Sequence, residues 1–210
     1  MAVRQAVRSA AEFLPKRFSL KSLREAAAHC EACDLYKYAT QTVFGEGAAR
    51  SKFMFVGEQP GDSEDRQGHP FVGPAGKLLR NAMETAGIDP RDVYITNAVK
   101  HFKFIERGKR RIHQKPKTIE VQACVPWLAS EIEVVKPKVV VALGATAAQA
   151  LLGSSFRLTK HRGEVFPSEL APAVIATVHP SSILRAPDDE TRHEEMKLFV
   201  RDLKQIARMA

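Results

Sequence analysis

The chain carries the stretch FMFVGEQPG at residues 53–61, in which four apolar residues run directly into a turn rich in glycine and proline. A short apolar run that stops at such a turn is typical of a strand buried on both faces of a parallel sheet. A second stretch, VIATVHPSS at residues 174–182, repeats the pattern and ends in His179 and two serines. Ligands bind beyond the carboxyl ends of parallel strands. We therefore expect Glu58, Gln59 and His179 to meet on one rim of a sheet.

Strand-like and helix-like segments alternate along the rest of the chain. Two more apolar runs, at residues 93–96 and 138–143, predict further strands, and helices are expected at residues 20–29, 74–86, 118–135, 145–151 and 188–210. This alternation predicts an α/β fold, a three-layer α/β/α sandwich around a central, mostly parallel four-stranded sheet. We expect residues 19–210 to form a single domain and residues 1–18 to be a disordered extension.

Composition limits the compartment and the class of partner. The 210 residues include 32 Lys and Arg against 24 Asp and Glu, a formal net charge of +8. No apolar run approaches the roughly 20 residues that cross a bilayer, and the first residues lack the apolar core of a signal peptide. We expect a cytoplasmic protein with no membrane contact. Three cysteines, an odd number, argue against a disulfide framework.

Much of the excess positive charge lies in one stretch, residues 100–117, which holds eight Lys or Arg residues and two histidines. A solvated loop is the simplest interpretation of such a stretch. However, it follows a predicted strand on the same rim as the two motifs, and long connections in compact domains are usually functional or disordered. We therefore expect it to contact a nucleic acid.

The cysteines suggest a metal site. Cys30 and Cys33 have the spacing of a metal-binding pair, whereas Cys124 is either a third ligand or a small buried residue of its helix. His101 is the best candidate for a fourth ligand, and His29 competes with it. Such a set suits zinc or an iron–sulfur cluster, and the spacing does not choose between them.

Seven motifs from residue 30 onward carry a resemblance to a known family. They are Cys30-x-x-Cys33, GEQPG at 57–61, GHPFVGPAG at 68–76, TNAVKHFK at 96–103, KRRIH at 109–113, CVPWL at 124–128 and HPSS at 179–182. The chain resembles the iron–sulfur uracil-DNA glycosylases of family 4, and more closely their UdgX-type branch. Ordinary family 4 enzymes have Ala at the position of Gln59, Cys at the position of His101, and no KRRIH segment.

The resemblance implies a fold, an activity and a cofactor. It implies the uracil-DNA glycosylase fold, excision of uracil from single-stranded DNA and also from double-stranded DNA, and a monomer. It also implies a [4Fe-4S] cluster held by Cys30, Cys33, His101 and Cys124.

Uracil excision leaves negative charge on the base and positive charge on the sugar, and the nucleotide must leave any duplex first. Phe71 is expected to stack on the base and Asn97 to pair with its edge, with Gly57 and Asp62 beside them and Asp65 as a further candidate. His179 is expected to donate to a uracil oxygen as charge develops there. The structural alternatives are a core aromatic, a turn asparagine and a structural histidine.

The remaining site residues are expected to act on the sugar and the backbone. Glu58 would stabilise the sugar cation or orient the nucleophile, and Gln59 would position a ribose, a water molecule or His113. Ile183 or Leu184 would enter the base stack as a wedge. The phosphate contacts are expected from Ser181, Ser182, Arg185, Lys109, Arg110 and Arg111, the last two also holding the loop down.

His113 carries the most specific prediction. In the UdgX-type branch the corresponding histidine attacks C1′ of the sugar and stays attached, so that a protein–DNA adduct forms. The alternatives are a conventional family 4 glycosylase that turns over, with His113 as a phosphate contact, and a non-catalytic nucleic-acid binder with a structural metal.

Overall fold

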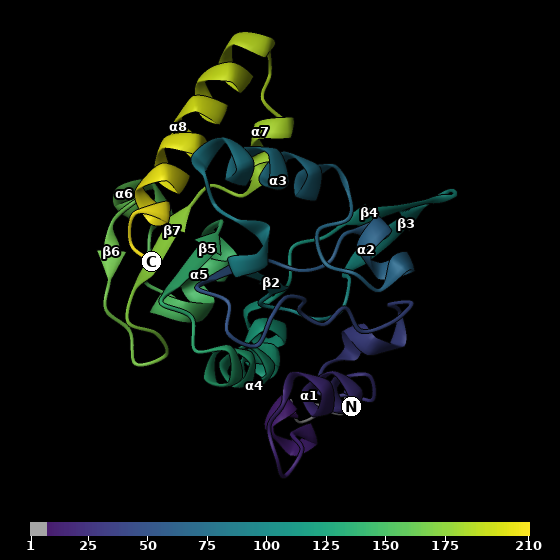
Figure 1. The fold of residues 1–210 in the computed structure, drawn as a ribbon. Helices are drawn as coiled ribbons and strands as arrows, with labels where there is room; N and C mark the ends of the chain where they lie inside the picture. Colours follow the sequence, from purple (N-terminus) through teal and green to yellow (C-terminus); the bar gives the residue numbers. More distant parts are fainter. Residues whose placement is uncertain (1–7) are drawn as a thin grey trace.

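The computed structural model describes residues 8–210, which fold as a sheet between two layers of helices (Figure 1). The strands are β1 Phe53–Gly57, β2 Val93–Asn97, β3 Phe104–Arg107, β4 Arg110–His113, β5 Val139–Leu143, β6 Val165–Phe166 and β7 Val174–Thr177. The α-helices are α1 Leu20–Ala27, α2 Asp62–Gln67, α3 Pro74–Ala86, α4 Thr118–Val135, α5 Ala145–Leu152, α6 Leu158–His161, α7 Pro180–Leu184 and α8 Asp189–Ala207. Short 3₁₀ helices are η1 Ala10–Phe13, η2 Asp34–Lys37 and η3 Pro90–Asp92.

The main sheet has the strand order β2-β1-β5-β7-β6. The first four strands are parallel, and β6 pairs antiparallel with β7 at the edge. The predicted α/β class and mostly parallel sheet are confirmed, but the sheet has five strands rather than four. The two residues of β6 are too few to show a periodic pattern in sequence.

Each face of the sheet buries its own hydrophobic core. On one face, alternate residues of β1, β5 and β7 pack against α3, α7 and α8, with Phe55, Leu79 and Phe199 fully buried. On the other face, Met54 and Val140 pack against α4 and α5. Because both faces are covered, β1 and β5 are buried along their whole length, which explains their unbroken apolar sequence.

A third cluster joins the N-terminal segment to α4 and corrects the predicted N-terminal boundary. Ala10 of η1 is fully buried beside Leu23 of α1 and Trp127 of α4. Within residues 8–18, Ala10, Phe13 and Leu14 therefore pack against the domain, although residues 1–18 were expected to be a disordered extension. The rest of that expectation, residues 1–7, lies outside the described residues. Within residues 8–210, none of the helices has the length and apolar character needed to span a bilayer.

The order of the strands determines where a ligand can bind. From β1 the chain moves outward on one side to β2, and β5 then pairs with the opposite side of β1. The carboxyl ends of β1 and β5 thus flank the point at which the strand order reverses, the usual position of a ligand site in an open parallel sheet.

A buried ion pair supports the end of β2. Lys100 Nζ contacts Glu131 Oε2 of α4, and the two side chains are 1% and 0% exposed. Lys100 Nζ also donates to the main-chain oxygen of Asn97 at 2.8 Å, while Tyr94 and Thr96 donate to the Glu131 carboxylate. Lys100 belongs to the basic stretch that was expected to contact nucleic acid, but its burial leaves it unavailable for that role.

Substitution of Lys100 by Met should leave the Glu131 carboxylate buried without its cation. We expect the free energy of unfolding to fall by about 3–5 kcal/mol, the usual cost of breaking a buried pair. Chemical denaturation measures this, and K138M, which removes an exposed lysine just before β5, should change stability by less than about 0.5 kcal/mol. A K100M protein as stable as K138M would contradict this interpretation of the pair.

Candidate active site

A cleft of about 790 Å³ opens at the carboxyl ends of the parallel strands. Each of four neighbouring strands contributes one functional side chain to it: Asn97 from the end of β2, Glu58 after β1, Thr146 after β5 and His179 after β7. The GEQPG and HPSS motifs therefore lie at the same rim of the sheet, as the sequence predicted. Other residues that line the cleft are Gln59, Gly61, Glu64, Phe71, Ala75, His113, Lys115, Leu143, Gly144, Ala145, Leu158, Val178, Ser181, Ser182 and Arg185.

Gly57 allows Phe71 and Asn97 to converge at the floor of the cleft. A Cβ atom on Gly57 would lie 2.3 Å from Asn97 Oδ1 and 2.7 Å from the Phe71 ring, so any larger residue would push them apart. Phe71 itself has a left-handed backbone, with φ 56°, and Arg80 Nη1 donates to its carbonyl oxygen at 2.9 Å. A left-handed conformation at a bulky residue is strained and is found mostly at functional positions.

The His179 ring stacks on Phe71, with ring centroids 5.9 Å apart and planes inclined by 29°. Its Nδ1 accepts the main-chain N–H of Ser181 at 3.1 Å. An acceptor nitrogen carries no proton, so the neutral ring must hold its proton on Nε2. Burial, followed by the charges of Arg185 and His113, lowers the pKa of His179 to about 4. His179 is therefore a neutral N–H donor at pH 7, suited to a carbonyl oxygen that gains negative charge.

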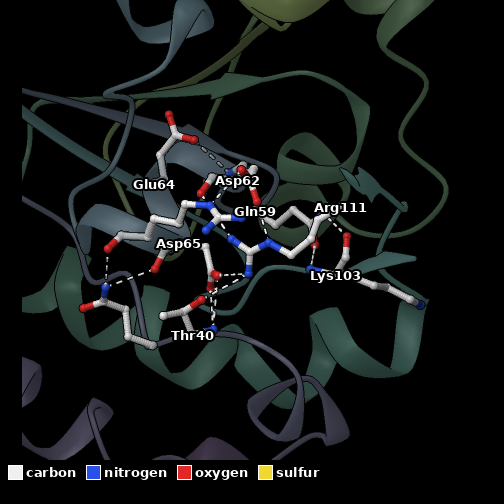
Figure 2. A network of polar contacts seen from close by, with 10 residues as sticks. Thr40, Gln59, Asp62, Glu64, Asp65, Lys103 and Arg111 are labelled. Atoms are coloured by element: carbon white, nitrogen blue, oxygen red, sulfur yellow. Dashed lines mark hydrogen bonds and ion pairs between the residues drawn. The ribbon is translucent and has the colours of Figure 1, made fainter. Parts of the chain in front are cut away.

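The basic stretch forms a two-stranded hairpin, β3–β4, which the sequence interpretation treated as a loop. Gln59 holds both of its ends (Figure 2). The Gln59 amide donates to the carbonyl oxygens of Lys103 at 3.2 Å and Gln114 at 3.0 Å, and accepts the N–H of Lys103 at 3.1 Å. The side chain thus contacts the main chain on each side of the hairpin, and through it fixes the position of His113.

Arg111 fastens the hairpin to α2 (Figure 2). Its guanidinium lies 2.5 Å from Asp62 Oδ1 and 2.7 Å from Asp65 Oδ2, and it covers the Phe104 ring at 4.9 Å. Two roles were predicted for Arg111, and these contacts are those expected for holding the loop. Its side chain is only 12% exposed. Asp62 and Asp65 belong to this clamp. Neither lines the cleft, in which Asp62 was predicted to bind uracil.

His113, the last residue of β4, faces Glu58 across the mouth of the cleft. The distance between His113 Nε2 and Glu58 Oε1 is 3.4 Å, and the Thr146 hydroxyl donates to the other carboxylate oxygen. Burial lowers the pKa of His113, while Glu58 raises it and Arg185 lowers it further, so the net shift is downward. The imidazole is therefore largely neutral near pH 7 and keeps a lone pair for a nucleophilic step.

The residues predicted to contact the DNA occupy three different places. Ser181, Ser182 and Arg185 line the cleft. Lys109 and Arg110 are exposed at the far end of the hairpin. Of the two predicted wedge residues, Ile183 is buried in the core and Leu184 is 38% exposed beside a separate groove between α3, α7 and α8, so only Leu184 is accessible.

The three cysteines lie together in the cluster between α1 and α4. Trp127 Nε1–H donates to Cys30 Sγ at 3.2 Å, and the Lys100 N–H donates to Cys124 Sγ at 3.3 Å. His101 is buried, with Nε2 2.9 Å from the Thr42 hydroxyl, whereas His29 is exposed. Among residues 8–210, no three His, Cys, Asp or Glu side chains are grouped as ligands of a single metal ion.

Known proteins match the sequence over most of the chain. A family model of the uracil DNA glycosylase superfamily matches residues 44–204. A type-4 uracil-DNA glycosylase of Pyrobaculum aerophilum is 37% identical over 175 residues, which cover 80% of this chain and 86% of that protein. The enzyme of the same name from Thermotoga maritima is 37% identical over 189 residues, 87% of this chain and 95% of that protein. The type-4 enzyme from Sulfurisphaera tokodaii is 34% identical over 200 residues, which cover 91% of this chain and 85% of that protein.

The chain belongs to the uracil-DNA glycosylase superfamily.

The structure also brings into the cleft residues that the sequence interpretation missed. Thr146, Lys115 and Glu64 line the cleft of this superfamily member. Glu64 accepts the N–H groups of Gly61 and Gly73, so it closes the loop that carries Phe71. Thr146 could have been found by the rule that found Glu58 and His179, because it follows the apolar strand β5.

The buried His179 should make stability depend on pH. Its pKa is about 4 in the folded protein against 6.5 for an ordinary histidine. Between these values the unfolded chain binds more protons, so stability is fully present above pH 6.5 and is lost as the pH falls. We expect the His179 contribution to cost about 2 kcal/mol at pH 5 relative to pH 7.

Denaturation of wild-type protein and H179N at both pH values measures this contribution. H179N should lose about 2 kcal/mol less between pH 7 and pH 5 than the wild type does. H193N, at an exposed position of α8, is the matched control and should follow the wild-type curve. Equal pH dependence in wild type and H179N would contradict the neutral, buried state of His179.

Proposed function

We propose that this protein is a uracil-DNA glycosylase that excises uracil from DNA and captures the resulting abasic site covalently through His113. Its substrates are uracil-containing single-stranded DNA and double-stranded DNA, and it acts as a monomer. The observation that carries the proposal is the pairing of a neutral, cleft-lining imidazole with the Glu58 carboxylate at 3.4 Å.

The first step breaks the bond between the sugar C1′ and the uracil nitrogen. The electron pair leaves with the uracil, whose carbonyl oxygen accepts the Nε2–H of His179 as it becomes negative. Phe71 and Asn97 hold the base: the ring gives a stacking surface, and the amide can both donate to and accept from the uracil edge. A site built to use both hydrogen bonds discriminates against cytosine, which presents a different donor and acceptor pattern there.

The second step uses the cation left on the sugar. Glu58 stabilises this positive charge as it develops. A lone pair of the neutral His113 ring then forms a bond to C1′, and the positive charge moves onto the imidazole. The proton on its other nitrogen is lost to Glu58 or to water, which leaves a neutral, alkylated ring. Uracil is released, and the DNA stays attached.

The conventional alternative, a glycosylase that releases an abasic product and turns over, is favoured by the names of the relatives, all three of which are called type-4 uracil-DNA glycosylases. In that case water, not His113, attacks C1′. The hairpin argues for covalent capture, because Gln59 and Arg111 both hold His113 at the cleft instead of leaving it in a mobile loop.

The cysteine cluster fits a [4Fe-4S] group better than zinc. Burial raises the pKa of Cys124 to about 12 and that of Cys33 to about 11, so both need a metal to become thiolates. N–H donors already point at two sulfur atoms, as is common around iron–sulfur ligands. Among residues 8–210, no three His, Cys, Asp or Glu side chains are grouped around a single metal ion such as zinc, whereas a four-iron cluster takes its ligands on separate iron atoms.

The fourth ligand in this proposal is His101. It follows Lys100, whose N–H contacts Cys124, and its Nε2 would exchange the Thr42 hydroxyl for iron. Excision needs no electron transfer, so the group would serve to hold α1, α4 and the segment after β2 together.

A denaturing gel tests the capture step. Wild-type protein incubated with a uracil-containing single-stranded oligonucleotide should give a band shifted by the mass of the protein. H113A should give no shifted band but should still release uracil, since departure of the base does not need the nucleophile. The matched control is H161A. His161 is 40% exposed and lies outside the cleft, so this variant should form the adduct normally. Uracil release by wild-type protein without any shifted band would instead support the conventional enzyme.

The visible spectrum and the iron content of anaerobically prepared protein test the cofactor. Wild-type protein should be brown and hold about four iron atoms per chain. C124S and H101A should lose iron, whereas H29A, which removes the exposed competing histidine, should retain it. Colourless wild-type protein with one zinc ion would contradict the assignment.

A further inference from the structure

Glu58 is held from two sides by residues that are far apart in the sequence. One carboxylate oxygen, Oε1, faces His113 Nε2 at 3.4 Å. The other, Oε2, accepts the hydroxyl hydrogen of Thr146, which lies 88 residues further along the chain. Thr146 is only 6% exposed, and its side chain ends in the cleft.

The fold itself brings Thr146 to this position. Glu58 follows β1 and Thr146 follows β5, the two adjacent strands that flank the reversal of strand order. Gly144 allows the start of α5 to lie close to His179: it has φ 90°, and a Cβ atom there would lie 3.1 Å from His179 Cβ. Its N–H donates to Thr177 O at 2.8 Å, which fixes the start of α5 against β7.

Two physical effects follow for Glu58. The Thr146 hydroxyl donates to the carboxylate, and the first turn of α5, which begins at Ala145, places the positive end of the helix dipole on the same side. Both interactions hold the Glu58 carboxylate in a fixed orientation. Holding a glutamate side chain in one position costs rotamer entropy. A partner on Oε2 therefore keeps Oε1 directed at His113.

We propose that Thr146 is a positioning residue for the nucleophilic step, because its hydroxyl fixes Glu58 in the orientation in which it supports His113. The proposal rests on the covalent function argued above. It assigns no direct contact between Thr146 and the DNA: Thr146 acts only through Glu58. When this support is lost, water captures a larger share of the sugar cation, and His113 a smaller share, than in the wild-type protein.

The test compares T146V, which keeps the shape of the side chain but lacks the donor, with T146S, which keeps the hydroxyl. Single-turnover reactions with a uracil-containing oligonucleotide give the rate of adduct formation and the ratio of free abasic product to adduct. We expect T146V to form the adduct about tenfold more slowly, as for the loss of one hydrogen bond to a charged group, and to release more abasic product. T146S should stay within about threefold of wild type.

A double-mutant comparison separates positioning from general destabilisation. If Thr146 acts through Glu58, T146V should add nothing in an E58A background, where there is no carboxylate to hold. The matched control is T177V, which removes another buried hydroxyl bonded to a carboxylate, that of Asp202 at 2.6 Å, outside the cleft. T177V should lower the melting temperature and leave the adduct rate unchanged.

Each result supports or overturns the proposal separately from the proposed function. A wild-type adduct rate in T146V, or an equal loss of rate when T146V is added to E58A, would overturn the role of Thr146. If T146V folds poorly, T146A and T146S, compared below their melting temperatures, decide the same question. Absence of the adduct with wild-type protein would instead refute the covalent function.

Discussion

The hydrogen bonds of one amide group, that of Gln59, connect the catalytic rim to the hairpin that carries His113. The side chain reaches from the turn after β1 to the main chain on both sides of β3–β4. Without it, the hairpin would be held mainly by the ion pairs of Arg111 with α2. Gln59 is only 7% exposed, and its three hydrogen bonds to main-chain atoms hold the hairpin in one position at the site.

The rest of the site follows from the order of the strands. Four parallel strands end at one rim, and the residue type that follows each strand supplies a different chemical group: an amide, a carboxylate, a hydroxyl and an imidazole. Small residues make the convergence possible at two points, Gly57 beneath Phe71 and Gly144 beside His179. The two histidines have lowered pKa values because burial disfavours their charged forms. Both are thereby neutral in the pH range in which the proposed chemistry needs a donor and a lone pair.

The sequence predicted most of the fold because its strands are apolar along their whole length and its helices have clear ends. Pro74 at the start of α3 and Gly87 after its end set that helix at the predicted residues. The hairpin and β6 were not predicted, because strands of four and two residues are too short to show a periodic pattern. The N-terminal packing was not predicted, because it depends on contacts with α4, which lies far along the chain. Arg111 shows the same limit: its charge suggested phosphate, but only the fold brings Asp62 and Asp65 to it. Thr146 has no local signal beyond following a strand.

The most direct measurement for the central claim is peptide mapping by mass spectrometry of the protein after reaction with a uracil-containing oligonucleotide and nuclease digestion. The account predicts one modified peptide that contains His113, with a deoxyribose remnant bonded to the imidazole and with uracil recovered free in equal amount. A remnant on any other residue, or release of uracil without a modified peptide, would contradict it.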